Sequence, residues 1–175
     1  ELAIGLIPDV GASDFLSQAP SYQGLAMALT GYRATAADAV RWGWGRGASD
    51  ASPPIAAGEA SVALETAAQL IVESADVFDW YAQLDGLSGT LPEQQAALAF
   101  AGKASALAAA VCWELMRHEV TGHLSFEARL RVELALVRRL TASGEFLCGI
   151  AGFLNRRPPE FLQGTLARTV SPKST

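Results

Sequence analysis

Apolar residues recur every three or four positions along most of this chain, which is the spacing of one face of an amphipathic α-helix. The clearest stripe consists of Val62, Leu64, Ala67, Leu70 and Ile71. Residues 1–7 do not show this helical spacing. We expect their apolar run to form an extended segment that ends at Pro8. The pattern predicts helices over residues 12–18, 22–30, 36–41, 60–74, 77–84, 103–120, 126–142 and 145–154, and one more that opens at Pro92.

Residues that favour helix ends mark several of these boundaries. Thr35 is a candidate N-cap, and with Asp38 three residues later it forms an imperfect version of the capping box. Ser125 is the expected N-cap of a later helix. Gly31 and Gly144 are the expected helix stops, because glycine readily adopts the left-handed conformation that ends a helix.

The clearest loop lies between residues 43 and 58, where Gly, Ser and Pro dominate and two prolines are adjacent. Every strong signal beyond this loop is helical. We therefore divide the chain into residues 1–47, a linker loop over 48–58 and a helical extension over 59–175.

Half of the 175 residues are hydrophobic and only 18% are charged, so few charged residues are available to cover the surface of a free monomer. Contact with other subunits or with another chain is therefore expected. The net charge of −5 gives no support for nucleic-acid binding through phosphates. No run approaches the roughly 18 apolar residues of a membrane span, and no signal peptide is visible. A cytoplasmic protein is the default expectation.

The two cysteines, Cys112 and Cys148, fit neither a metal-binding spacing nor a redox pair. Cys112 stands in an apolar run, and we expect it to be a small buried hydrophobe. No metal site is expected.

The stretch from Glu1 to Gly11 carries the strongest chemical signal, because it sets the carboxylates of Glu1 and Asp9 eight residues apart around an apolar run. A carboxylate among apolar residues loses hydration, which raises its pKa towards values useful for acid–base catalysis. The alternative is structural: a strand followed by a turn in which Asp9 caps the next helix. Residue types alone leave both interpretations open.

Three motifs follow one another in an order that is specific to one family. They are the segment Glu1–Gly11, the residues Ala28-Leu29-Thr30-Gly31-Tyr32-Arg33, and the residues Ala36-Ala37-Asp38-Ala39 ahead of Trp42-Gly43. Together they resemble the crotonase (enoyl-CoA hydratase/isomerase) superfamily. The residues Pro8-Asp9-Val10-Gly11 are similar to its 3-hydroxyisobutyryl-CoA hydrolase branch. A looser likeness to the helical C-terminal extension of that branch runs through residues 124–150.

The resemblance implies a mainly α chain that is the C-terminal helical portion of a crotonase-like α/β spiral fold. Residues 1–47 would be the end of the crotonase core and would carry the active-site segment. The β-rich N-terminal half would be a separate or cleaved polypeptide. The family also implies a homo-oligomer of the trimer type.

The resemblance further implies hydrolysis of the thioester of a small 3-hydroxyacyl-CoA. Glu1 would activate a water or attack the thioester carbonyl, and Asp9 would bind the β-hydroxyl group or transfer a proton. Gly5, Pro8 and Gly11, the candidate substrate-binding residues, would shape the backbone so that both acids reach one cavity. Backbone amides of the N-terminal half would hold the oxyanion. Coenzyme A enters as part of the substrate, and no other cofactor is expected.

Two alternatives stay open. An enoyl-CoA hydratase or a dienoyl-CoA isomerase would use the same pair of acids to move protons. A non-catalytic, crotonase-like partner subunit would keep the fold without turnover. The residues Cys148 and Asn155-Arg156-Arg157 allow this, because they stand where the family usually has an acidic residue and an Asp-Lys pair.

Overall fold

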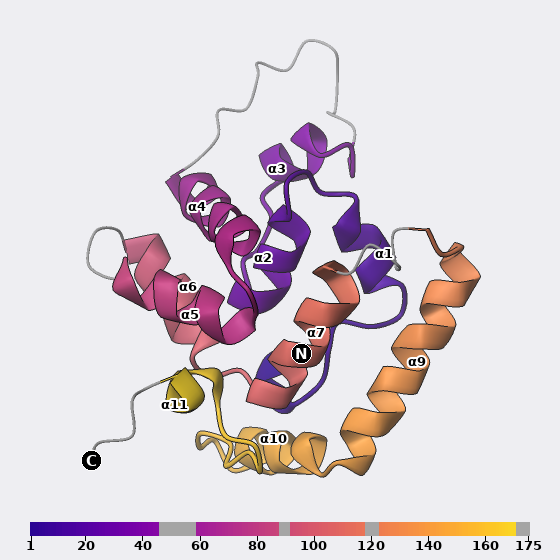
Figure 1. Cartoon of the computed structure of the whole chain (residues 1–175), viewed down its shortest axis with the longest axis vertical. Coiled ribbons are helices and arrows are strands. Elements are labelled where there is room, and N and C mark those ends of the chain that lie inside the picture. Colours follow the sequence, from indigo (N-terminus) through magenta and orange to yellow (C-terminus); the bar gives the residue numbers. More distant parts are fainter. Residues whose placement is uncertain (46–58, 88–91, 118–122, 171–175) are drawn as a thin grey trace.

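The computed structural model describes residues 1–45, 59–87, 92–117 and 123–170 (Figure 1). Within these ranges the protein is helical and forms no β-strand, so the prediction of a mainly α chain is confirmed. No described helix has the length and apolar character that crossing a membrane requires. The elements, in chain order, are the 3-10 helix η1 (Leu2–Ile4) and the α-helices α1 (Ala12–Ser17), α2 (Gln23–Thr30), α3 (Ala36–Arg41), α4 (Glu59–Glu73), α5 (Val77–Gly86), α6 (Pro92–Ala101), α7 (Ala106–Arg117), α9 (Phe126–Ala142), α10 (Glu145–Leu154) and α11 (Leu166–Val170).

Local capping bonds fix several helix ends where the sequence predicts them. The Thr35 hydroxyl accepts the Asp38 N–H (3.2 Å), and the Asp38 carboxylate accepts the Thr35 N–H (2.9 Å), so the capping box of α3 is complete. The Ser125 hydroxyl accepts the Ala128 N–H (3.3 Å) at the start of α9. Gly31 ends α2 in the left-handed conformation, with φ of 65°. These predicted caps are confirmed.

The predicted extended segment over residues 1–7 is wrong. Residues Leu2–Ile4 form η1, and Gly5 follows in a left-handed conformation (φ 77°) that an extended strand does not contain. The Glu1 carbonyl accepts the N–H groups of Ile4 (2.9 Å) and Leu6 (3.2 Å), which closes the turn.

Two further differences concern the later helices. Helix α7 begins at Ala106 rather than at residue 103, because the Ser105 hydroxyl accepts the Ala108 N–H (3.2 Å) and caps the helix there. Its predicted continuation beyond residue 117 lies outside the described residues. Helix α11 has no counterpart among the predicted helices.

One hydrophobic core joins the helices on both sides of residues 46–58. Helix α2 packs against α4, α6 and α7, and α4 packs against α5. Trp80 and Trp113 are the largest fully buried side chains, and the Trp80 indole N–H donates to the Ala67 carbonyl (2.9 Å). The predicted linker lies outside the described residues, so the division of the chain at that point stays a prediction.

The C-terminal helices return to the beginning of the chain. Helix α9 packs against α1, and α10 packs against η1 and α9. In Figure 1, α9 and α10 form an outer arm that turns the lower corner of the molecule. The first residues of the chain therefore contact this arm at two places, η1 at α10 and α1 at α9.

Candidate active site

Glu1 lies at the edge of a hollow of about 310 Å³ between α1, α2 and α6. Its side chain is exposed, and Pro8 lines the same hollow. The rest of the wall is mostly apolar and includes Phe15, Leu16, Met27, Tyr32 and Phe100. A carboxylate beside an apolar hollow is a suitable arrangement for a general base that acts on a small, largely apolar group.

Asp9 is half-buried and lines a different hollow, of about 200 Å³. Its wall is formed by Val10 and by side chains of α9, among them Leu130, Val137 and Glu133. The described residues therefore do not bring Glu1 and Asp9 to one hollow. The action of these two carboxylates as a pair stays a prediction.

Gly5 and Gly11 shape the backbone on either side of Pro8, and both have left-handed φ angles, 77° and 89°. A side chain at Gly5 would meet the backbone carbonyl of Glu145 at 2.7 Å, so η1 lies directly on the backbone of α10. The Gly11 N–H donates to the Glu133 carboxylate (2.7 Å). Contact of Gly5, Pro8 and Gly11 with a substrate stays a prediction.

Glu133 is a functional candidate that the sequence patterns did not single out. It is 1% exposed on α9, and its carboxylate accepts the Gly11 N–H (2.7 Å), the Ser13 N–H (2.8 Å) and the Ser13 hydroxyl (2.5 Å). A signal was present in the sequence, because Glu133 stands in the apolar stripe between Leu130 and Val137. A carboxylate at such a position needs buried partners.

Glu145, at the start of α10, is a second fully buried carboxylate. It accepts the Ser105 hydroxyl (2.5 Å) and the Gln163 N–H (2.9 Å). The Ser105 N–H donates to the Leu2 carbonyl (3.0 Å), so Glu145 is linked to η1 through Ser105. In the sequence Glu145 looks like an ordinary acidic residue of a first helical turn, and no pattern marks it.

Tyr32, which lines the hollow beside Glu1, is held in place by Asp38. The Tyr32 hydroxyl donates to the Asp38 carboxylate (2.8 Å), and burial together with this bond raises the pKa of Tyr32 to about 12. Burial alone would raise the pKa of Asp38, but the hydrogen bonds from Thr35 and Tyr32 and the charge of Arg41 lower it below its usual value. Tyr32 therefore forms a fixed part of the wall.

Cys112 is fully buried, and burial raises the pKa of its thiol to about 12. The thiol therefore stays protonated at neutral pH, and the prediction of a buried, hydrophobe-like cysteine is confirmed. Among the residues that the structure describes, no three His, Cys, Asp or Glu side chains form a group that could hold a metal ion.

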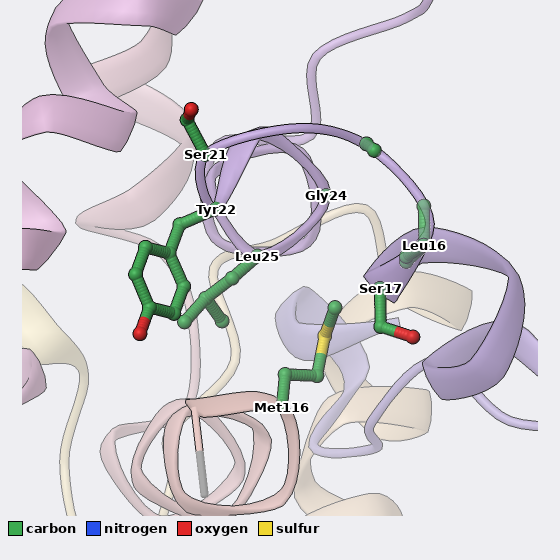
Figure 2. A pocket seen from close by; sticks show the side chains of 8 residues that line it. Leu16, Ser17, Ser21, Tyr22, Gly24, Leu25 and Met116 are labelled. Carbon is green, nitrogen blue, oxygen red and sulfur yellow. The ribbon is translucent and has the colours of Figure 1, made fainter. Parts of the chain in front are cut away.

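A further hollow, of about 260 Å³, lies between α1, α2 and α7 (Figure 2). Figure 2 shows the Met116 side chain extending from α7 into the space between Leu25 and Ser17. Leu16 lines both this hollow and the one beside Glu1, so it separates the two. Ser17 and Ser21 add polar atoms to a lining that is otherwise mostly apolar.

Comparison with known proteins connects the first part of the chain to one enzyme family. Residues 1–53 match the family model described as enoyl-CoA hydratase/isomerase. No curated protein matches the chain in sequence.

Two solved structures are similar to nearly the whole chain. An enoyl-CoA hydratase from Rhodobacter sphaeroides 2.4.1 is 26% identical, with a TM-score of 0.75 over 99% of this chain. A carnitinyl-CoA dehydratase from Mycobacterium thermoresistibile is 25% identical, with a TM-score of 0.77 over 100% of this chain. The chain spans 56% and 55% of the length of these two proteins. The predicted fold class, the helical C-terminal portion of such a protein, is confirmed.

Proposed function

Because the chain is similar in sequence and fold to the crotonase superfamily, we propose that it carries the acyl-binding part of an acyl-CoA enzyme. The proposal is supported most directly by the hollow beside Glu1, where a carboxylate borders a largely apolar wall. Its volume of about 310 Å³ is at the small end of ligand pockets, which favours a small acyl group.

We propose hydrolysis of the thioester of a small 3-hydroxyacyl-CoA as the reaction. Glu1 takes a proton from a water molecule, and the oxygen of that water attacks the thioester carbonyl carbon. The carbon–sulfur bond then breaks, and the CoA sulfur takes the proton back from Glu1, which gives the free thiol and a carboxylic acid and restores the Glu1 carboxylate. For Asp9 we propose a contact with the 3-hydroxyl group, which requires the substrate to reach the separate hollow that Asp9 lines. Donors from outside this chain hold the oxyanion.

Hydration or dehydration of an enoyl-CoA is the second candidate. It is favoured by the descriptions of the two similar structures, a hydratase and a dehydratase. In this reaction water adds across the carbon–carbon double bond beside the thioester, and the thioester survives. The two candidates therefore differ in one product, the free thiol of coenzyme A.

The test incubates the protein, assembled with the polypeptide that supplies the oxyanion donors, with 3-hydroxyisobutyryl-CoA and, separately, with crotonyl-CoA. Free thiol is measured in the first reaction and loss of the enoyl thioester in the second. Thiol release supports the hydrolase. Turnover of crotonyl-CoA with the thioester intact supports the hydratase instead.

Glu1→Gln tests the assigned base in whichever reaction occurs. We expect kcat to fall by about 100-fold or more, the range that a general base contributes. Glu114→Gln is the matched control, because Glu114 is exposed on α7 and lines neither hollow that holds a candidate acid. An equal kcat in both variants would remove Glu1 from the mechanism. Absence of turnover in the unaltered assembly would favour a non-catalytic subunit.

A further inference from the structure

We propose that Glu133 is a positioning residue that holds Asp9 in its working orientation, an inference that rests on the function proposed above. Glu133 comes from α9, 122 residues after Gly11 in the sequence. It accepts a hydrogen bond from the backbone N–H of Gly11, two residues after Asp9, and lines the same hollow as Asp9.

The contacts of Glu133 lie at the turn that carries Asp9. One carboxylate oxygen accepts the Gly11 N–H (2.7 Å), and the other accepts the Ser13 N–H (2.8 Å) and the Ser13 hydroxyl. All three partners are donors, and the two carboxylate oxygens of Glu133 accept all three bonds. The two amides belong to the start of α1, which has no side-chain cap of its own.

The turn needs such support because its backbone conformation is energetically unfavourable. Val10 has φ of 58°, a left-handed conformation that β-branched residues rarely adopt, and Gly11 follows with φ of 89°. The Asp9 carbonyl accepts the Ala12 N–H (3.0 Å), which closes the turn locally. A helix of six residues contributes little stability of its own. Glu133 therefore fixes the direction in which the chain, and with it the Asp9 side chain, enters α1.

A purely structural cap would make the same bonds, so the test must separate positioning from folding. Glu133→Gln keeps the shape of the side chain but replaces one oxygen by an NH₂ group. That group would face a backbone N–H, so two donors would meet and the turn would shift. A displacement of about 1 Å at a reacting group is enough to lower turnover by about 100-fold.

The experiment measures kcat and KM for Glu133→Gln, Asp9→Asn and the double variant in the reaction identified above. We expect Glu133→Gln to lower kcat by about 10- to 100-fold, with KM changed less than about threefold. If Glu133 acts through Asp9, the double variant is no slower than Asp9→Asn alone. Glu127→Gln is the matched control, since Glu127 is exposed on the same helix and lines neither hollow that holds a candidate acid. Its kcat should stay close to that of the unaltered protein.

Thermal unfolding of each variant shows whether it is folded at the assay temperature. If Glu133→Gln is unfolded there, Glu133→Asp replaces it, because a shorter carboxylate keeps the charge but does not reach both amides. Two outcomes would overturn the positioning role and leave the proposed function intact. One is a double variant whose loss of kcat is the product of the two single losses. The other is an unchanged kcat in Glu133→Gln while Asp9→Asn is impaired. An unchanged kcat in both Glu1→Gln and Asp9→Asn would instead remove the proposed function.

Discussion

The contact between α10 and η1 allows a quantitative prediction for Gly149→Ala. Gly149 is buried, and a Cβ atom there would lie 2.3 Å from the Ile4 carbonyl oxygen and 2.4 Å from the Ile4 carbonyl carbon. Both neighbours are backbone atoms, which cannot rotate away as a side chain does. The added methyl group must therefore push η1 and α10 apart.

The expected loss of stability follows from two opposing effects. Alanine has a helix propensity better than that of glycine by about 1 kcal/mol. Reaching an ordinary contact distance of 3.4 Å requires a separation of about 1 Å, which loosens Leu2 and Ile7, two fully buried side chains beside the contact. Overpacking of this kind destabilises by up to about 3 kcal/mol. The net change is a loss of about 2 kcal/mol, or about 4–8 °C in Tm for a chain of this size.

Thermal unfolding followed by circular dichroism measures this change. Gly86→Ala is the matched control, because Gly86 is also helical and a Cβ atom there meets nothing within 4 Å. The control should be as stable as the unaltered chain or slightly more stable. If Gly149→Ala unfolds at the same temperature as Gly86→Ala, the close approach of η1 to α10 is refuted.

Three more predictions concern buried polar groups. Ser105→Ala removes a donor from the buried Glu145 carboxylate and should lower the free energy of unfolding in urea by about 2–3 kcal/mol; an unchanged midpoint would contradict this bond. Trp80→Phe leaves the Ala67 carbonyl without its donor and should lower the same free energy by about 2–3 kcal/mol, so a stability equal to that of the unaltered chain would refute the contact. The lowered pKa of Asp38 stabilises the folded state above its unfolded pKa of about 4, and this contribution is lost as the pH falls through the folded pKa. Asp38→Asn should therefore flatten the fall of Tm below about pH 4, and a parallel fall in both proteins would show that Asp38 is not the titrating group.

Most of the helices could be predicted because the interactions that define them are local. Leu64, Ala67 and Ile71 of the predicted stripe give α4 its buried face, and the bonds of Thr35 and Ser125 lie within one helical turn. Each of these signals is complete within a single helix and its cap. The sequence therefore contained all that was needed for these elements.

The candidate site could be predicted only in part. Glu1, Gly5, Asp9 and Gly11 belong to one short segment, so their spacing was visible in the sequence. The conformation of that segment was not visible in the sequence. It depends on the packing of η1 against the backbone of α10 and on the hydrogen bonds from the turn before α1 to Glu133. Both supports come from helices more than 100 residues away along the chain, beyond the reach of any local pattern.

The position of Glu133 also bears on how the C-terminal helices relate to the candidate site. The family match ends at residue 53, whereas the carboxylate that fixes the turn at Val10 and Gly11 lies on α9. Two of the three hydrogen bonds to Glu133 come from backbone N–H groups, so most of its contact with the turn does not depend on which side chains follow Asp9. The arrangement has two requirements. Position 11 needs a residue that tolerates φ of 89°, and the facing helix α9 needs a hydrogen-bond acceptor. Helix α9 is therefore part of the structure that presents Asp9, and its sequence can alter the orientation of this carboxylate without any change in residues 1–53.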